Sequence, residues 1–285
     1  MANDISQRIK NTAHTFSKGQ KKIASAILND YDKAAYMTAA ALGRYVGVSE
    51  STVVRFAGAL GFDGYVEFQR AVQELVRTRL TPNQRIEITK QRIGRGDVLE
   101  NVMESDINKI RFTLETLDRE AFYKSVDAIL SAKRIYVMGA RSAGVLAQML
   151  DYNLSMIFDN VKFIHPFSSA EIFEQMFSID QNDVLIAFSF PRYSSKMVDA
   201  VKYARQRGAS VVVFTDSEIS PIAEYASYLL TAQSDMASFM DSLVAPISII
   251  NAIIVEITNR REKQITERFN TLEKIWDEFG VYTKR

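Results

Sequence analysis

Apolar residues recur at every third or fourth position along the first 80 residues, and this spacing predicts an all-helical region. Ser17 and Gln20 have the spacing of a capping box, which predicts a helix over residues 18–30. A further helix is expected over residues 65–80 and ends at Thr81-Pro82, because proline disfavours its continuation. The inward face of that helix is expected to contain Phe68, Val72 and Leu75.

Between these helices, residues 38–64 have the pattern of a helix-turn-helix. Thr38 and Ser49 are expected to be N-caps, because each hydroxyl can accept a hydrogen bond from a free backbone N–H group. Gly47 allows the tight turn between the helices, and Gly61 occupies the position at which glycine commonly ends a helix. The two helices are expected over residues 39–46 and 50–60.

The packing face and the polar face of this motif both favour DNA binding over an ordinary helical hairpin, which is the alternative. Gly43 is small where the two helices cross. The apolar residues at the expected contact are Leu42, Val46, Val48, Val53 and Phe56. The opposite face of the second helix is polar, with Ser49, Glu50, Ser51, Thr52 and Arg55. The predicted DNA-binding residues are Ser49, Ser51, Thr52, Arg55 and Arg44.

Charge is unevenly distributed along the chain, although the net charge is only +1. Residues 1–80 contain eleven Lys and Arg residues against seven Asp and Glu residues, a net charge of +4, and the remainder has a net charge of −3. A basic N-terminal region suits contact with nucleic acid. Lys21, Lys22 and Arg44 are candidates for contacts with phosphate groups.

Residues 81–97 are polar and include two glycines, so a linker is expected there. A long helix is then expected to begin near Asp97. Its apolar residues alternate steps of four and three and form one seam: Met103, Ile107, Ile110, Leu114 and Leu117. The seam indicates either packing against the helix's own domain or a dimer contact.

From residue 134 onward, short β-rich runs alternate with helical segments, a pattern typical of a parallel sheet covered on both faces. Strands are expected over residues 134–138, 161–164, 184–188, 211–215 and 228–231. Helices are expected over residues 144–158, 169–177, 195–207, 220–226, 242–261 and 262–279. The predicted fold class is α/β, with an all-helical domain over residues 1–80 and a three-layer α/β/α domain with a five-stranded parallel sheet over residues 98–285.

Two loops that join a strand to a helix contain the candidate effector-binding residues. The first loop runs from Gly139 to Gly144 and the second from Ser189 to Ser195. Each places hydroxyl and N–H groups at a helix N-terminus, and each has an arginine that can bind phosphate or carboxylate through two hydrogen bonds. The candidate residues are Arg141, Ser142, Ser189, Arg192 and Ser194. Capped strand–helix turns without a ligand are the alternative.

Other kinds of site have little support in the sequence. The first loop lacks the dinucleotide motif G-x-G-x-x-G because Arg141 occupies the middle glycine position, and no G-x-x-x-x-G-K-[ST] motif is present. The chain has no cysteine and only two histidines, so neither a metal nor a cofactor is expected. With no apolar signal segment and no membrane-spanning run, a cytoplasmic location is expected.

The chain resembles the RpiR family of bacterial transcriptional regulators through VSESTVVRFAGALGFDGYVEF (residues 48–68), the two loops, and TDSEISPIAEYA (residues 215–226). The resemblance implies a helix-turn-helix joined to a sugar isomerase (SIS) domain, in a homodimer or homotetramer that binds double-stranded operator DNA and senses a phosphorylated sugar.

The loops depart from the usual SIS patterns, which are G-x-G-x-S and S-x-S-G-x-[ST]. Arg141 replaces the second glycine and Ala143 the serine of the first loop, and Pro191 and Arg192 replace the central Ser-Gly of the second. We therefore expect arginine side chains to take over part of the role of the backbone. The effector is expected to be a phosphorylated sugar, a sugar acid or another anionic metabolite.

The expected function is transcriptional regulation, and the alternative is a ketose–aldose isomerase on the same scaffold. Isomerisation needs a base that moves a proton between adjacent carbons. Neither loop contains Glu, His or Lys, and the nearest candidates outside the loops are Glu171, Glu174 and His165. No enzymatic activity and no catalytic residue are therefore expected.

Overall fold

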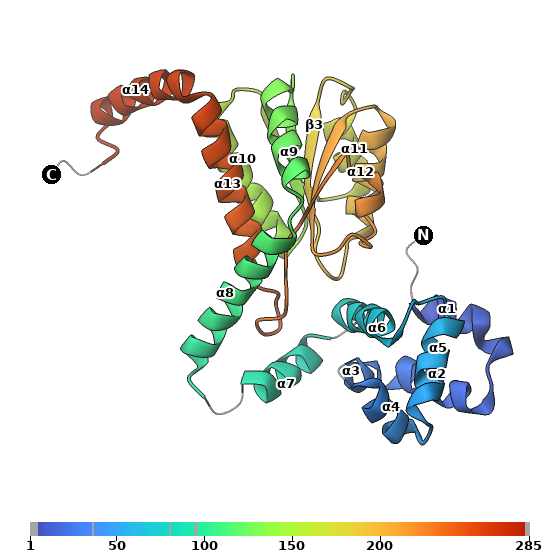
Figure 1. Ribbon diagram of the computed structural model, residues 1–285. Helices are drawn as coiled ribbons and strands as arrows, with labels where there is room; N and C mark the ends of the chain where they lie inside the picture. The colour runs from blue at the N-terminus through green and yellow to red at the C-terminus, as the bar shows by residue number, and fades with distance from the viewer. Residues whose placement is uncertain (1–4, 36, 80, 94–95, 283–285) are drawn as a thin grey trace. The chain divides into compact units, whose positions relative to one another are not determined.

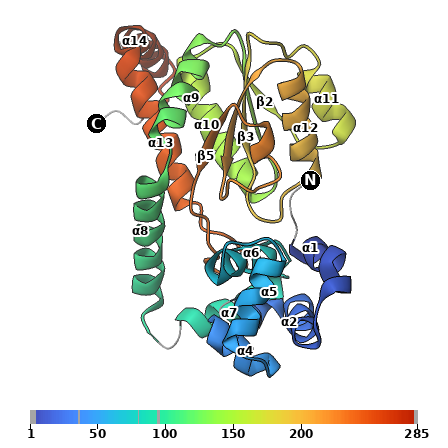
Figure 2. The same cartoon turned by 45° about the vertical axis from the view of Figure 1, so that its right-hand side comes forward.

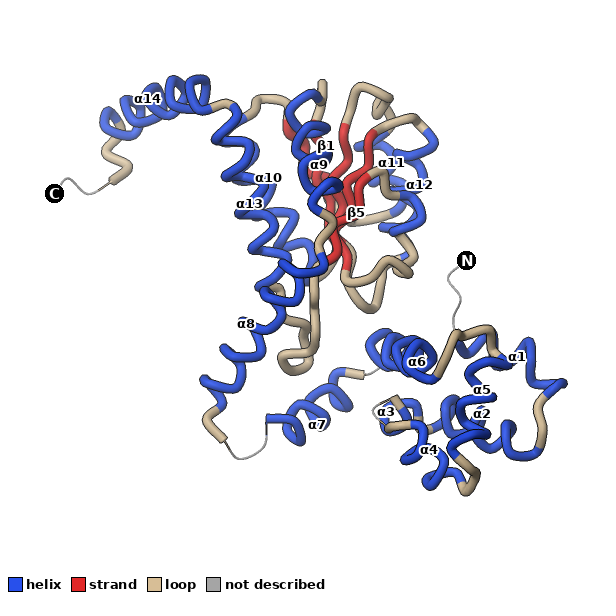
Figure 3. Tube along the Cα trace, viewed as in Figure 1, coloured by secondary structure: helices blue, strands red, loops and turns tan. Residues whose placement is uncertain are grey.

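The computed structural model describes residues 5–35, 37–79, 81–93 and 96–282, and the chain divides into two compact units, Met1–Ile88 and Thr89–Arg285 (Figure 1). The first unit is helical, and the second contains a five-stranded parallel sheet between helices (Figure 3). This arrangement confirms the predicted fold class. The predicted domain boundaries at residues 80 and 98 stay a prediction.

The N-terminal unit packs short helices around buried aromatic rings. The helices are α1 (Ile5–Thr12), α2 (Lys18–Asn29), α3 (Tyr31–Ala34), α4 (Ala39–Val46), α5 (Glu50–Ala59) and α6 (Tyr65–Arg79), and a further helix, α7 (Pro82–Ile93), extends across the boundary between the two units. The ring of Phe56 is fully buried and lies 5.1 Å from the ring of Phe16 and 5.7 Å from that of Phe68. Val72 is buried on the same face of α6 as Phe68, as predicted, whereas the side chain of Leu75 lies outside the described residues.

Polar side chains of α6 hold the segment that leads into the helix-turn-helix. The Tyr65 hydroxyl donates a hydrogen bond to the backbone oxygen of Met37 at 2.7 Å, and Gln69 Nε2 donates to the same oxygen at 2.8 Å. Burial raises the pKa of Tyr65 to about 12, so the hydroxyl remains a neutral donor at neutral pH. These bonds satisfy a carbonyl group that no helix uses.

The helix-turn-helix has the predicted caps with one exception. Thr38 Oγ1 accepts from the Ala41 N–H at 3.2 Å, and Gly47 ends α4 in the left-handed region, with φ of 70°. The capping box of Ser17 and Gln20 at the start of α2 is also confirmed.

The exception is Ser49, which occupies the N-cap position of α5 without capping it. Its hydroxyl hydrogen-bonds the hydroxyls of Ser51, at 3.0 Å, and Thr52, at 2.8 Å, and accepts no backbone N–H. The hydroxyls of Ser51 and Thr52 therefore bind Ser49 Oγ in place of a backbone N–H group of α5. This polar cluster lies at the exposed start of the helix.

The crossing of α4 and α5 depends on Gly43. A Cβ atom there would lie only 2.8 Å from the backbone oxygen of Val48, so Gly43→Ala is expected to destabilise the unit by about 1–3 kcal/mol. Gly58→Ala is the matched control, because a Cβ there meets nothing within 4 Å and alanine favours the helix by about 1 kcal/mol. Denaturant unfolding measures both changes, and a Gly43→Ala variant as stable as the wild type would contradict the close packing.

The predicted linker is largely helical in the structure. Thr81 and Gln84 form a capping box, with Gln84 Oε1 accepting from the Thr81 N–H at 2.9 Å, and Pro82 is the first residue of α7. Proline is compatible with the first helical position because that N–H has no partner within a helix. The helix over Pro82–Ile93 was not predicted, and the role of residues 81–97 as a linker stays a prediction.

The C-terminal unit has helices on both faces of a parallel sheet in the order β2-β1-β3-β4-β5 (Figure 2). Its strands are β1 (Ile135–Gly139), β2 (Val161–Ile164), β3 (Val184–Phe188), β4 (Ser210–Thr215) and β5 (Tyr228–Thr231). Its helices are α8 (Val98–Thr116), α9 (Arg119–Ser131), α10 (Ser142–Ile157), α11 (Ser169–Met176), α12 (Ser195–Gln206), α13 (Val244–Arg260) and α14 (Glu262–Glu278). Helices α9, α10 and α13 contribute to the core on one face, and α11 and α12 to the core on the other.

Two parts of this unit differ from the sequence prediction. Residues 220–226 form only a short 3₁₀ turn, Ala223–Tyr225, instead of a helix. Burial of Ile222 and local turn hydrogen bonds fix this segment in place of a continued helix. Helix α9 was not predicted.

Helix α8 leaves most of its apolar seam uncovered within the C-terminal unit. Its buried face contains Lys109 and Thr113, whereas Leu117 is half-buried against the core. The seam residues that remain exposed are Met103, Ile107, Ile110 and Leu114. Of the two interpretations of the seam, packing against its own domain is therefore not observed for four of its five residues.

Candidate functional site

The strand order brings the two candidate loops together at one edge of the sheet. Strand β1 continues into α10 and β2 on one side, whereas β3 continues into α12 and β4 on the other. Ligands bind at such a switch point in open parallel sheets. Gly139 pairs with Phe188 at the ends of β1 and β3, so the loops that follow leave the sheet side by side.

Gly139 allows the first loop and the start of α10 to pack closely against the end of β1. A Cβ at Gly139 would lie 2.5 Å from the backbone oxygen of Ala143, so only glycine permits this approach of α10. Arg141 stands just before α10 with φ of 57° and ψ of −128°, and Ser142 is the first helical residue. A non-glycine residue in that region is strained by about 1–3 kcal/mol.

The second loop also contains an arginine with positive φ. Arg192 has φ of 68°, and in the described residues Arg141 and Arg192 are the non-glycine residues with positive φ. Ser189 is buried at the end of β3, with its N–H donating to the Phe214 oxygen at 3.0 Å, and Ser194 is the N-cap residue of α12. In both loops an arginine therefore adopts a positive φ, a backbone conformation that glycine adopts readily.

The candidate side chains have unused hydrogen-bonding capacity. Within the described residues, no hydrogen bond or ion pair involves the side chains of Arg141, Ser142, Ser189, Arg192 and Ser194. The starts of α10 and α12 add the positive ends of two helix dipoles. This combination of free donors, two cations and strained backbone suits an anionic ligand.

The candidate bases of an isomerase lie on neighbouring elements. His165 follows β2, and its ring stacks on Phe167 with centroids 5.3 Å apart. Its backbone N–H donates to Gln175 Oε1 at 3.0 Å, which fixes the loop locally. Glu171 and Glu174 are exposed on α11. No observed contact links these three side chains to the two loops within the described residues.

Three further residues around the loops were not identified from the sequence. Tyr193 donates its hydroxyl hydrogen to Asp216 Oδ1 at 2.8 Å, which ties the second loop to the end of β4. Lys196 Nζ donates to the Phe167 oxygen at 2.9 Å. Lys196 could have been found as a basic residue in the first turn of a helix, where the helix dipole disfavours it. The Tyr193–Asp216 pair depends on tertiary contact alone.

Of the predicted DNA-binding residues, Arg44 lies on α4, Ser49 is the N-cap residue of α5, and the other three, Ser51, Thr52 and Arg55, lie on α5. Arg44, Ser49, Ser51 and Arg55 are exposed and Thr52 is half-buried. Arg55 Nε donates to the Ser51 oxygen at 3.2 Å, so the guanidinium group lies along the exposed face of α5. Hydroxyl and cationic groups of this kind can contact DNA, and the role of these residues stays a prediction.

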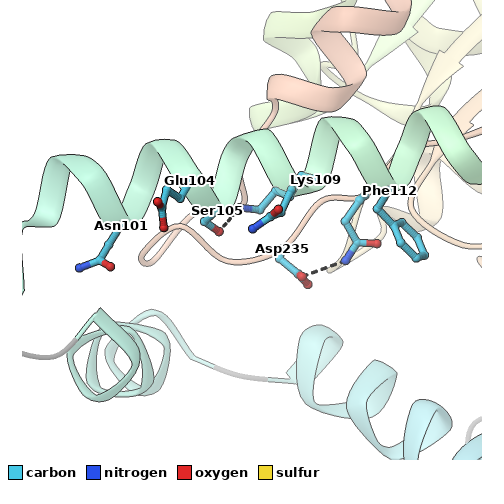
Figure 4. A pocket seen from close by; sticks show the side chains of 8 residues that line it. Asn101, Glu104, Ser105, Lys109, Phe112 and Asp235 are labelled. Carbon is cyan, nitrogen blue, oxygen red and sulfur yellow. Dashed lines mark hydrogen bonds between the residues drawn. The ribbon is translucent and has the colours of Figure 1, made fainter.

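A polar groove of about 510 Å³ runs along α8 (Figure 4). It is lined by Asn101, Glu104, Ser105, Asn108, Lys109, Phe112, Gln233 and Asp235. Lys109 Nζ donates to Ser105 Oγ at 2.7 Å and to Asp106 Oδ1 at 3.2 Å, and Asp106 also accepts from Ser242 Oγ at 2.7 Å. Because its lysine is already paired, the groove suits an anion less well than the two loops do.

Neither a metal centre nor a membrane span is found in the part of the chain that the structure describes. Those residues contain no cluster of three or more His, Cys, Asp or Glu side chains able to hold a metal ion. None of their helices combines the length and apolar character that crossing a bilayer requires.

Family models match both units. The SIS domain model matches residues 128–256, and the model of the helix-turn-helix domain, rpiR family, matches residues 3–78. An HTH-type transcriptional regulator of Clostridium perfringens is 23% identical over 93% of this chain and 95% of its own length.

Solved structures share the fold. The sugar isomerase domain of an RpiR transcription factor from Sphaerobacter thermophilus is 25% identical, with a TM-score of 0.58 over 61% of this chain and 97% of that one. Vibrio vulnificus NanR complexed with ManNAc-6P is 18% identical, with a TM-score of 0.62 over 98% of this chain and 99% of that one.

Fold, site and matches together define a helix-turn-helix transcriptional regulator with a SIS domain. The chain belongs to the RpiR family.

Proposed function

We propose that this regulator binds double-stranded operator DNA as a homodimer or homotetramer in the cytoplasm and senses a phosphorylated sugar or related anionic metabolite through its SIS domain. The observation on which the proposal rests is the pair of adjacent loops at the switch point, each with an arginine and serines whose side chains form no hydrogen bond to other described residues. NanR, which shares the fold, was solved with ManNAc-6P, and this supports a phosphorylated sugar as the effector.

In this proposal the effector's anionic group binds between the N-termini of α10 and α12. Its contacts are Arg141, Ser142, Ser189, Arg192 and Ser194. The effector changes DNA affinity only to the extent that it binds the DNA-competent and DNA-incompetent states with different affinities.

Calorimetric titration with phosphorylated sugars and sugar acids, each beside its unphosphorylated parent, tests the proposal. We expect at least one phosphorylated compound to bind, its parent to bind at least tenfold more weakly, and the bound compound to change affinity for operator DNA. Equal binding of phosphorylated and parent compounds would exclude an anion site at these loops.

We further propose that the SIS domain has no isomerase activity. The five proposed effector contacts offer hydroxyl and guanidinium groups, and none of them is a carboxylate or imidazole base. Purified protein incubated with phosphorylated ketoses and aldoses is expected to show no interconversion above background. Turnover that disappears in Glu171→Gln or Glu174→Gln would instead establish the isomerase.

A further inference from the structure

Helix α8 has an uncovered apolar stripe along most of its length. Met103 is 57% exposed, Ile107 51%, Ile110 39% and Leu114 61%. Four such residues at successive steps of four, three and four form a seam of the kind that binds another helix. The core of its own unit uses a different face of α8, where Lys109 and Thr113 are buried.

We propose that the partner of this seam is α8 of a second copy, packed antiparallel about a two-fold axis near Asn108 and Lys109. The steps of four, three and four read the same in both directions. An antiparallel pair therefore places Met103 of one copy opposite Leu114 of the other, and Ile107 opposite Ile110, so that every seam residue has an apolar partner. Such self-complementarity is what a two-fold interface requires.

The charges beside the seam favour the same geometry. Glu104 follows Met103 and Arg111 follows Ile110, so both lie on the same flank of the seam. A two-fold axis perpendicular to the helices places this flank of one copy against the same flank of the other copy. Glu104 of each copy therefore approaches Arg111 of the other, and the dimer contains two such pairs. Neither side chain forms an ion pair within the described residues.

A parallel pair fits less well. It would bring the Arg111 flank against the opposite flank, where the acidic side chain is Asp106. That carboxylate already accepts hydrogen bonds from Lys109, at 3.2 Å, and from Ser242, at 2.7 Å. The charges available for a contact between copies are therefore those that pair in the antiparallel arrangement.

This inference rests on the homo-oligomer of the proposed function and deepens it by assigning an interface. Because the chain has no cysteine, engineered disulfides test it without background. The double variant Met103→Cys, Leu114→Cys is expected to give a covalent dimer on mild oxidation. Each single variant is the control. In the antiparallel pair a residue lies opposite the position eleven residues away in the other copy, so the two copies of the same cysteine are about 16 Å apart along the helix axis, too far for a disulfide.

Charge reversal provides a second, independent measurement. Glu104→Arg and Arg111→Glu are each expected to weaken dimerisation about three- to tenfold in analytical ultracentrifugation, and the double variant is expected to restore it. Cross-linking of the single-cysteine variants, or a dimer that tolerates Ile107→Asp with Ile110→Asp, would overturn this interface while leaving the homo-oligomer intact. A monomeric wild-type protein at high concentration would overturn the homo-oligomer as well.

Discussion

Replacing both loop arginines, in the variant Arg141→Ala, Arg192→Ala, is expected to weaken effector binding by a factor of about 10²–10⁴. Hydrogen bonds to a charged group contribute about 1.5–3 kcal/mol each, and the two guanidinium groups have no hydrogen-bond partner in the part of the chain that the structure describes that would compensate for them. Calorimetry with the phosphorylated compound that the wild type binds measures the loss. DNA binding in the absence of effector is the control and should remain close to that of the wild type.

Two substitutions of Arg141 distinguish the role of its side chain from that of its backbone conformation. Arg141→Gly removes the cation and also relieves the strain at φ of 57°, so it is expected to weaken the effector while stabilising the C-terminal unit by about 1 kcal/mol. Arg141→Ala removes the same cation but keeps the strain. If Arg141 serves ligand binding, both variants are expected to bind the effector more weakly, and only Arg141→Gly is expected to be more stable than the wild type.

Equal effector affinity in the wild type and in the double alanine variant would refute the assignment of these arginines. A loss of stability in Arg141→Gly would instead show that the guanidinium group supports the fold. Denaturant unfolding and calorimetry on the same preparations distinguish the two outcomes.

The second large effect is expected at the DNA-binding surface. Arg55→Ala should cost about 1–3 kcal/mol at a specific operator if the arginine reads a base, because a paired contact to a base edge is lost. Arg44→Ala is the matched comparison, since a phosphate contact is expected to weaken binding to all sequences alike and to lower the salt dependence by about one charge. Fluorescence anisotropy on specific and random duplexes at several salt concentrations measures both.

A two-fold dimer predicts a roughly palindromic operator. Footprinting that protected no inverted repeat near the regulated genes would argue strongly against the assignment of residues on α5. So would an Arg55→Ala variant that weakened specific and random duplexes equally, because the arginine would then contact phosphate only.

The residues of the candidate site were proposed from the sequence and stay a prediction, whereas their conformation could not be predicted. Arginine and serine next to a strand–helix junction indicated an anion site at both loops. Arg141 and Arg192 stand where the usual SIS patterns have glycine, but their residue type did not predict the positive φ of both, since a non-glycine residue ordinarily avoids it. The Tyr193–Asp216 hydrogen bond was also inaccessible, because it joins loops that follow different strands.

Local chemistry explains why the sequence by itself determined most helix and strand boundaries. Capping by Thr38, the left-handed turn at Gly47 and the periodicity of buried residues all act within a few positions along the chain. The prediction failed at residues 220–226, which form a turn in place of a helix, and it missed the helix α7 within the predicted linker.

Only the tertiary structure decided which surfaces meet. The sequence did not establish which strands are neighbours, and the order β2-β1-β3-β4-β5 is what places the two arginine loops side by side. It likewise identified the apolar residues of α8 without saying which of them the unit covers. Periodicity shows that a helix has an apolar face, whereas burial depends on partners that are distant in the sequence, and here the fold covers Thr113 and leaves Ile107 exposed.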